Sequence, residues 1–506
     1  MTLPTPPTTL ARDRSAGNGD RPSAERLASF APWVLVGYAI VQCLIRLALS
    51  SNLEADEAQF IGQIDFRWGY GNSQGPLYNW LVGLAHAASG SWPFAVAVPK
   101  HFFLAATYVL QYDVVRRLTG SAVAGAAGAF GLLLVPQIAI ISEITLAHTV
   151  MVQAAVTATL HALVLIFERG SVGRFLWLGI AVSVGTLGKY NFLLVVIALV
   201  VVTLLVPEIR RRLVSPMLLA TMAVVVVAIA PHLVWAVNHR ATVAERLNKM
   251  SERNDLFYWI DLPAIGIDGF LALLWGVAVA VLPLYLVWRL ATGFSKPPQA
   301  AAVRVELSEA ALRRLFLFAW VLPVAMFAVL VLALDAHDVR LRYVTPLIMS
   351  FPVWIGLVWP VANDLVAARR IVAAGGAFAA IMLVGWPVSV MTANGPFNYP
   401  YGEMAAAIAE TVEPPYAIAA PGGVDRNLVA RIDGAALWDA DGPANSVLVV
   451  VRGNGRPEEF ADRLGDAYAP SGKSGEASFR GHYLVDRMHT LRWRLFERQP
   501  DQPASR

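Results

Sequence analysis

The feature that most constrains this chain is a succession of apolar stretches, most of them nearly long enough to cross a bilayer. A transmembrane helix needs about 20 mostly apolar residues. About eleven candidates are present: Ala31–Leu49, Trp92–Val115, Ala122–Val135, Thr149–Phe167, Phe175–Leu187, Phe192–Val206, Met217–Val237, Ile267–Trp288, Leu315–Leu334, Pro346–Val361 and Ile371–Val390. The sequence therefore predicts an α-helical polytopic membrane protein.

The composition supports this prediction and excludes several classes of protein. Charged residues make up 15 % of the 506 residues and apolar residues 57 %, whereas a soluble domain carries roughly a quarter charged residues. These values exclude a soluble globular enzyme, a disordered chain and a nucleic-acid binder. The single cysteine, Cys43, excludes an intrachain disulfide and a zinc site made of CxxC pairs.

The basic residues between the apolar stretches predict the orientation in the membrane. With a cytoplasmic N-terminus, the inner segments carry about twice as many Lys and Arg residues as the outer loops, as the positive-inside rule requires. Most inner segments hold an Arg cluster at the end of a span, such as Arg210–Arg212. Eleven spans place the C-terminal segment outside, whereas ten or twelve would place it inside.

The chain divides into three predicted parts. Residues 1–30 are rich in Pro, Thr, Ser and Arg, which predicts a disordered cytoplasmic tail. Residues 31–393 hold the apolar stretches and form the predicted transmembrane domain. Residues 394–506 are more polar and include short strand-like runs such as Ser446–Val451. This last part predicts a small α/β domain on the outer side.

The first outer loop, residues 50–91, is long and rich in polar side chains. Asp56, Gln59 and Gln63 fall on one face of a helix, with apolar residues beside them. This pattern predicts an amphipathic helix at the membrane surface. Pro76–Ala88 predicts a second interfacial helix, with a proline near its first turn.

Asp56 and Glu57 are adjacent in this loop. Neighbouring residues on a helix point about 100° apart, so only one of the two is expected to face a reacting centre. The alternative is that both carboxylates merely stabilise the N-terminus of a helix. Spacing alone does not separate these two interpretations.

Four segments, in chain order, resemble the GT-C superfamily of membrane glycosyltransferases. They are the Asp56–Glu57 pair with the later Gly75–Leu77 turn, Gly185–Tyr190, Pro231–His239 and Arg342–Pro346. The chain is most similar to the family 39 and 83 group, which includes protein mannosyltransferases and the lipid A aminoarabinose transferase. The resemblance implies a GT-C-type membrane domain, a catalytic first outer loop and a multi-pass protein of the bacterial inner membrane with a periplasmic C-terminal domain.

The resemblance also implies a role for individual residues. Asp56 would act as the general base that takes the proton of an acceptor hydroxyl, and Glu57 would orient it or bind a metal ion. The donor would be a polyprenyl-phosphate-linked sugar, and direct attack by the acceptor would invert the anomeric centre. Cations would stabilise the leaving phosphate, with tyrosines as hydrogen-bonding partners. These candidate phosphate-binding residues are Lys189, Tyr190, Arg340, Arg342 and Tyr343.

Simpler interpretations of the same residues remain open. Lys189 is also explained as a lysine that reaches the interface from a helix end, and Arg340 and Arg342 as partners of Asp335 or Asp338 in a surface network. A second group is assigned only to substrate or metal binding in general: Gln74, His148, His239 and His337. The spacing identifies no metal-ligand set, although a divalent metal ion remains open, and no other cofactor is expected.

Two positions depart from the pattern of the resembled families. Gln74 stands where many relatives have the Lys of a Lys-Pro-Pro segment, and His148 stands near a position that is acidic in many relatives. The first change removes a cation expected near the donor phosphate. The second replaces a carboxylate with an imidazole.

The function expected from these features is sugar transfer at the outer membrane face. The partners would be a polyprenyl-phosphate sugar donor, a glycolipid, glycan or protein acceptor, and the lipid bilayer. The alternative function is a lipid or sugar transporter or flippase without glycosyl transfer. Such a protein would be expected to carry charges within its spans, whereas here the charges lie mostly at the span ends.

Overall fold

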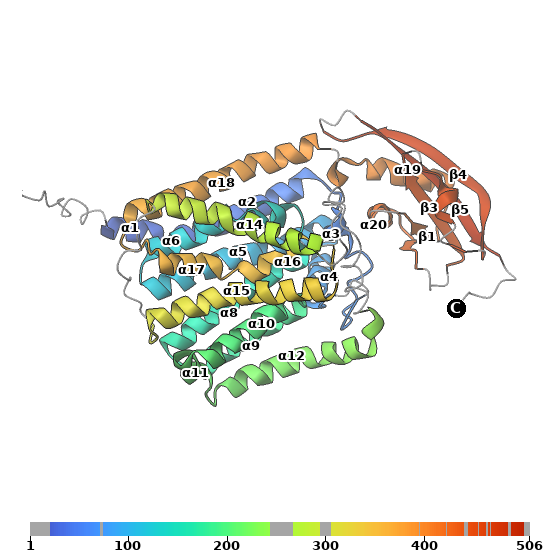
Figure 1. The fold of residues 1–506 in the computed structure, drawn as a ribbon. Helices are drawn as coiled ribbons and strands as arrows, with labels where there is room; N and C mark the ends of the chain where they lie inside the picture. The colour runs from blue at the N-terminus through green and yellow to red at the C-terminus, as the bar shows by residue number, and fades with distance from the viewer. Residues whose placement is uncertain are drawn as a thin grey trace, which may run out of the picture.

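Most of the described chain is helical. The computed structural model describes residues 21–70, 74–242, 267–293, 305–337, 339–393, 395–420, 423–439, 444–453, 455–461, 464–465, 467–483 and 487–499. Figure 1 shows a bundle of long helices joined at one end to a smaller α/β domain. This arrangement confirms the predicted polytopic fold with a small C-terminal α/β part.

The bundle helices follow the apolar stretches closely. They are α2 (Ala31–Leu49), α5 (Trp92–Thr119), α6 (Ala122–Gly131), α8 (Ala147–Glu168), α9 (Val172–Gly188), α10 (Phe192–Leu205), α12 (Leu218–Asn238), α14 (Ile267–Ala291), α15 (Glu309–Ala333), α17 (Phe351–Val358) and α18 (Leu365–Thr392). Helices satisfy their own backbone hydrogen bonds, which a lipid environment requires.

The described residues contain 7 helices that are long and apolar enough to cross a membrane, or up to 10 if each bent pair is one span. One bent pair joins α10 to α11 (Pro207–Leu213) at 110°, and another joins Leu341–Ile348 to α17 at 45°. The shorter helix α9, with 17 residues, occupies the place of a further predicted span. The number eleven therefore stays a prediction.

Part of the N-terminal tail differs from its prediction. Residues 1–20 lie outside the described residues, but Arg21–Ala28 forms helix α1, so the expectation of disorder is wrong for this segment. The Glu25 carboxylate accepts hydrogen bonds from the Ser121 hydroxyl and the Ala122 amide at 2.6 Å each. These bonds dock α1 against the start of α6 and compensate for its weak apolar character.

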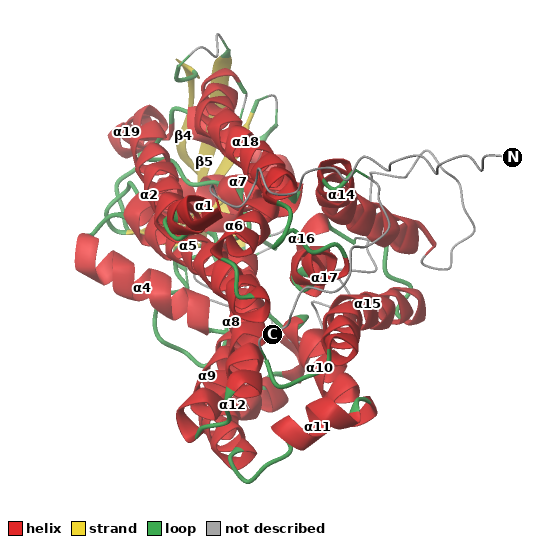
Figure 2. Cartoon of the chain, turned by 90° about the vertical axis from the view of Figure 1, so that its left-hand side faces the viewer, coloured by secondary structure: helices red, strands yellow, loops and turns green. Residues whose placement is uncertain are grey.

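The first outer loop contains two helices of unequal length. Helix α3 (Ala55–Ala58) is a single turn, so the predicted amphipathic helix does not continue to Gln63. The chain turns instead and reaches Gly62 at φ +80°, a conformation that ends a helix. Helix α4 (Leu77–Ser89) forms as predicted and lies across the direction of the bundle helices (Figure 2).

The C-terminal domain is built on one mixed sheet in the order β2-β1-β3-β5-β4. The strands are β1 (Tyr416–Ala419), β2 (Ala435–Leu437), β3 (Ser446–Arg452), β4 (Tyr468–Arg480) and β5 (Met488–Arg498), and the helices are α19 (Tyr401–Thr411), α20 (Val424–Val429) and α21 (Pro457–Ala461). Strand β3 pairs in parallel with β1 and antiparallel with β5. The fully buried run Val447–Val450 explains its central position.

Candidate functional site

A small polar pocket lies where the first outer loop meets the bundle. Its volume is about 20 Å³, which is comparable to the space that one water molecule needs. Loop residues meet residues from α8, from the end of α9 and from α16 (Leu341–Val344). The lining comprises Asp56, Gln59, Gln74, Leu146, Ala147, His148, Thr149, Lys189 and Arg342.

Asp56 is the one acidic residue among the described residues that line this pocket. Its carboxylate accepts hydrogen bonds from Nη1 of Arg342 at 3.2 and 3.3 Å, from the Thr145 hydroxyl at 2.7 Å and from the Leu146 amide at 3.4 Å. Leu146 has φ +71°, an uncommon conformation for a residue with a side chain. This strained residue presents its N–H to Asp56, and such strain is typical of functional sites.

These contacts determine the charge of Asp56. Burial alone would raise the pKa of its carboxyl group, but the Arg342 guanidinium, the bonds from Thr145 and Leu146 and the charge of Lys189 together lower the pKa below its ordinary value. Asp56 is therefore ionised at neutral pH. A carboxylate paired in this way is ready to accept a hydrogen bond but is a weak base until its cations are engaged elsewhere.

Two cations and one aromatic ring complete the same side of the pocket. Lys189 is buried, and its Nζ donates to the Thr149 hydroxyl at 2.9 Å. The Tyr343 ring lies 5.1 Å from the Lys189 nitrogen and 5.7 Å from the Arg342 guanidinium carbon. Such cation–π contacts hold the two charges in place. One carboxylate therefore faces two positioned cations.

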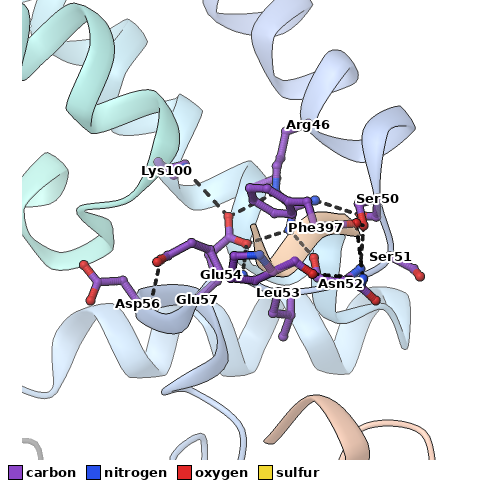
Figure 3. A network of polar contacts seen from close by, with 12 residues as sticks. Arg46, Ser50, Ser51, Asn52, Leu53, Glu54, Asp56, Glu57, Lys100 and Phe397 are labelled. Atoms are coloured by element: carbon purple, nitrogen blue, oxygen red, sulfur yellow. Dashed lines mark hydrogen bonds and ion pairs between the residues drawn. The ribbon is translucent and has the colours of Figure 1, made fainter. Parts of the chain in front are cut away.

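Glu57 points away from this pocket into the protein. It is 2 % exposed, and its carboxylate binds the Arg46 guanidinium of α2 through two bonds at 3.1 and 2.6 Å. Nζ of Lys100, on α5, lies 3.7 Å from Oε1 of the same carboxylate (Figure 3). Burial would raise the pKa of Glu57, but Arg46 and Lys100 lower it. Glu57 thus anchors the loop to two bundle helices.

A capping box explains why the two acidic side chains diverge. Glu54 accepts a hydrogen bond from the Asp56 amide at 2.8 Å, and Glu57 accepts one from the Glu54 amide at 3.2 Å. This reciprocal pair starts α3. Helical spacing then directs Asp56 outward and Glu57 inward, as Figure 3 shows. The spacing Glu-x-x-Glu at residues 54–57 is typical of such a cap.

The remaining predicted residues divide into two groups. Gln74 and His148 line the pocket with Asp56. Tyr190, Arg340, His239 and His337 are not among its lining residues. The Tyr190 hydroxyl lies 3.2 Å from Nε2 of His232, and His337 lies 2.6 Å from Asp268. Arg340 and His239 are exposed. The structure thus brings together Asp56, Lys189, Arg342, Tyr343, Gln74 and His148.

The donor set does not match a divalent metal site. Within the described ranges, no group of three or more His, Cys, Asp and Glu side chains is placed to hold a metal ion. The charged groups that act on Asp56 are Arg342 and Lys189, which are cations.

The C-terminal domain holds the segment that leads into α3. The Asn427 side chain of α20 donates to the Leu53 carbonyl and accepts from the Leu53 amide, both at 3.0 Å. Arg431 donates to the Asn52 side chain at 2.7 Å, and Asn52 donates to the Tyr399 carbonyl at 2.7 Å. The first outer loop is thus fixed on one side by α2 and α5 and on the other by the outer domain.

Several of these residues escape sequence reasoning. Thr145, Thr149, Asn427 and Arg431 are ordinary polar residues far from Asp56 in the chain, and nothing local marks them. Arg46 differs from them, because a charged residue within an apolar span indicates that the residue has a specific partner.

Comparison with known proteins gives one family model and two curated relatives. The model described as "Dolichyl-phosphate-mannose-protein mannosyltransferase" matches residues 73–235. The lipopolysaccharide core galacturonosyltransferase RgtA of Rhizobium johnstonii is 28 % identical over 338 residues, which span 65 % of this chain and 64 % of RgtA. RgtB of the same organism is 27 % identical over 426 residues, 81 % of this chain and 83 % of RgtB.

Solved structures of ArnT from Cupriavidus metallidurans share the fold. The ArnT structure bound to undecaprenyl phosphate has a TM-score of 0.56, 14 % identity, and covers 91 % of this chain and 97 % of ArnT. The apo structure has a TM-score of 0.58 with the same coverage. This likeness extends over the bundle and the C-terminal domain together.

Proposed function

We propose that this chain, a membrane protein of the GT-C glycosyltransferase superfamily, transfers a sugar from a polyprenyl-phosphate donor to a glycolipid acceptor. The reaction takes place at the outer face of the inner membrane, with the C-terminal domain in the periplasm. The observation that carries the proposal is the pocket in which Asp56 faces Arg342 and Lys189. A carboxylate beside two cations matches the needs of a reaction in which a hydroxyl loses a proton and a phosphate departs.

The proposed mechanism is a direct displacement. The acceptor hydroxyl oxygen attacks the anomeric carbon of the donor, and Asp56 takes the hydroxyl proton. The bond between the anomeric carbon and the phosphate oxygen breaks, and polyprenyl phosphate leaves with the electron pair. One displacement inverts the anomeric centre.

Arg342 has two tasks in this mechanism. Before the donor binds, it pairs with Asp56 and lowers the pKa of that carboxyl. A donor phosphate competes for the same guanidinium, which weakens the pair with Asp56. The pKa of Asp56 then rises, so that the base gains strength when the substrate is present. Lys189 provides the second cation at the departing phosphate.

The choice of substrates is supported by the named relatives. RgtA and RgtB are lipopolysaccharide core galacturonosyltransferases, which supports a glycolipid acceptor over a protein or a free glycan. The ArnT structure with undecaprenyl phosphate supports a polyprenyl-phosphate donor. Gln74 lines the pocket and stands where many members of the resembled families have a Lys. Lys189 and Arg342 therefore take over the contact with the phosphate.

The test compares the envelope glycolipids of a strain lacking this chain with those of strains that carry the wild type or Asp56→Asn. Mass spectrometry is expected to show one sugar missing in the deletion strain, restored by the wild type and not by the variant. Restoration by Asp56→Asn would contradict the proposed base. Movement of a lipid-linked sugar across the membrane without a new glycosidic bond would favour the flippase alternative.

A further inference from the structure

A second pocket lies in the C-terminal domain and shares no lining residue with the Asp56 pocket. Its volume is about 290 Å³, close to the lower end, about 300 Å³, of pockets that hold small ligands. The walls include Tyr399, Arg452, Arg487, His489 and Thr490. The proposed mechanism uses none of these residues.

The charged groups of this pocket have one sign. Arg452 and Arg487 line it, and none of its described lining residues is acidic. Glu403, on α19, lies 3.3 Å from Nε2 of His482, and neither residue is among the described lining residues. Two guanidinium groups in a pocket whose described lining residues include no carboxylate suit an anion, because each group presents several N–H donors to phosphate or carboxylate oxygens.

His489 adds a buried polar group on the same wall. It is 7 % exposed, and its Nε2 atom has no hydrogen-bond partner among the described residues. A buried polar atom without a partner has lost its hydration and costs folding free energy. Burial lowers the pKa of His489, and Arg487, Arg452 and His482 lower it further. An anionic ligand that accepts a hydrogen bond at Nε2 would remove this cost.

The pocket also contains an aromatic surface. The Tyr399 ring lies 4.9 Å from the Arg452 guanidinium carbon, and its centroid lies 4.4 Å from that of the His489 imidazole. An aromatic ring next to arginines suits a ligand with an apolar face and an anionic substituent. A sugar ring that carries a phosphate or a carboxylate has both features.

The position of Tyr399 links this pocket to the catalytic loop. Helix α18 ends at Thr392, and this end of the bundle meets the outer domain (Figure 1). Tyr399 follows a few residues later in the chain. Its carbonyl accepts a hydrogen bond from Asn52, and the Asn52 carbonyl accepts one from Arg46, which holds Glu57. A ligand here therefore lies on the same side of the molecule as the catalytic loop.

We propose that this pocket binds an anionic sugar of the acceptor glycolipid, a phosphorylated sugar or a uronic acid, and positions the acceptor for transfer at Asp56. This inference rests on the proposed function for the identity of the acceptor. The anion-binding property itself stands on the pocket alone.

The first experiment measures binding to the purified full chain in detergent micelles. The probes are glucose 1-phosphate and glucuronate, with glucose as the neutral sugar and glycerol 1-phosphate as a phospholipid head group. Calorimetry is expected to show binding of the two anionic sugars and at least tenfold weaker binding in Arg452→Gln/Arg487→Gln. The control Arg494→Gln removes an arginine of β5 that pairs with Glu458 and should bind as the wild type does.

Three results would overturn the proposal. They are equal binding of glucose, unchanged binding in the double variant, and binding of glycerol 1-phosphate as strong as that of glucose 1-phosphate, which would assign the site to membrane phospholipid. Melting temperatures of all variants establish that each is folded.

The second experiment measures transfer kinetics with the acceptor glycolipid before and after treatment with phosphatase. The double variant should raise KM for the untreated acceptor about tenfold and leave kcat nearly unchanged. With the treated acceptor the difference should shrink if the bound anion is a phosphate and persist if it is the carboxylate of a uronic acid. An unchanged KM contradicts the acceptor role. If the wild type transfers no sugar to any acceptor, the proposed function fails, whereas the binding experiment still decides the anion site.

Discussion

Asp56 and Arg342 lie 286 positions apart in the chain, yet Nη1 of Arg342 is 3.2 and 3.3 Å from the two carboxylate oxygens of Asp56. The first outer loop supplies one partner, and the short helix α16, just before α17, supplies the other. Neither charge is fully buried, since the side chains are 26 % and 21 % exposed. A soluble anion or a bound phosphate can therefore compete for the guanidinium.

Asp56→Asn tests the proposed base. The amide keeps the shape of the side chain but cannot take a proton, so transfer should fall by about 10²–10⁴-fold. The measurement is sugar transfer by the purified chain, with the melting temperature recorded in parallel. Asp65→Asn, in the same loop and paired with Arg67, is the matched control and should keep its activity. Transfer near the wild-type rate in Asp56→Asn would refute the assignment.

Arg342→Gln tests the coupling between the guanidinium and the carboxylate. Arg342 lowers the pKa of Asp56, so its removal should raise that pKa. Since the base must be ionised to accept a proton, activity is lost as the pH falls through this pKa, and the acid limb of the profile of kcat/KM against pH should move to higher pH. Arg340→Gln changes an exposed neighbour and should leave the limb in place. An unmoved limb in Arg342→Gln would contradict the coupling.

Glu57→Ala tests whether Glu57 is an anchor and not a reactive group. Removing one member of a buried ion pair costs about 3–5 kcal/mol, so the melting temperature should fall strongly. Combination with Arg46→Ala should cost less than the sum of the single changes, because both lose the same interaction. A Glu57→Gln chain that is fully stable yet inactive would instead indicate a direct role with substrate.

Asn427→Ala tests the link between the outer domain and the first outer loop. The change removes both hydrogen bonds to Leu53, at a cost of about 1–3 kcal/mol. Hydrogen exchange should become faster in residues 50–62, and kcat should fall while the bundle stays protected. Arg426→Gln alters the same helix outside this contact and serves as the control. Unchanged hydrogen exchange in the loop would contradict the inference that the outer domain holds the loop in place.

Gly75→Ala tests the close approach of the loop to α9. A Cβ atom at this position would lie 2.0 Å from the Leu187 carbonyl oxygen, a backbone atom that cannot yield easily. The loop must shift, and Gln74 with it, so transfer should decrease together with the melting temperature. Gly37→Ala, where a Cβ atom would meet nothing within 4 Å apart from its chain neighbours and the backbone of its own helix, should be neutral. A neutral Gly75→Ala would show that the loop tolerates displacement.

The apolar pattern by itself determined much of the architecture. The boundaries of α2, Ala31–Leu49, match the predicted span at both ends, and α4 and β3 form where their patterns predict them. A backbone in lipid forms helices here because each peptide group must find its hydrogen-bond partner within the protein. The residue types in the first loop and in the Arg342–Pro346 segment also predicted part of the pocket.

The tertiary structure decided how the polar residues are used. Sequence spacing required Asp56 and Glu57 to diverge, but only the contacts with Arg342 on one side and Arg46 on the other decided which one faces the pocket. The same holds for Thr145 and Asn427, which reach the loop across long separations in sequence. The physical reason is that local spacing fixes directions along one helix, whereas partners depend on how distant helices and the outer domain pack.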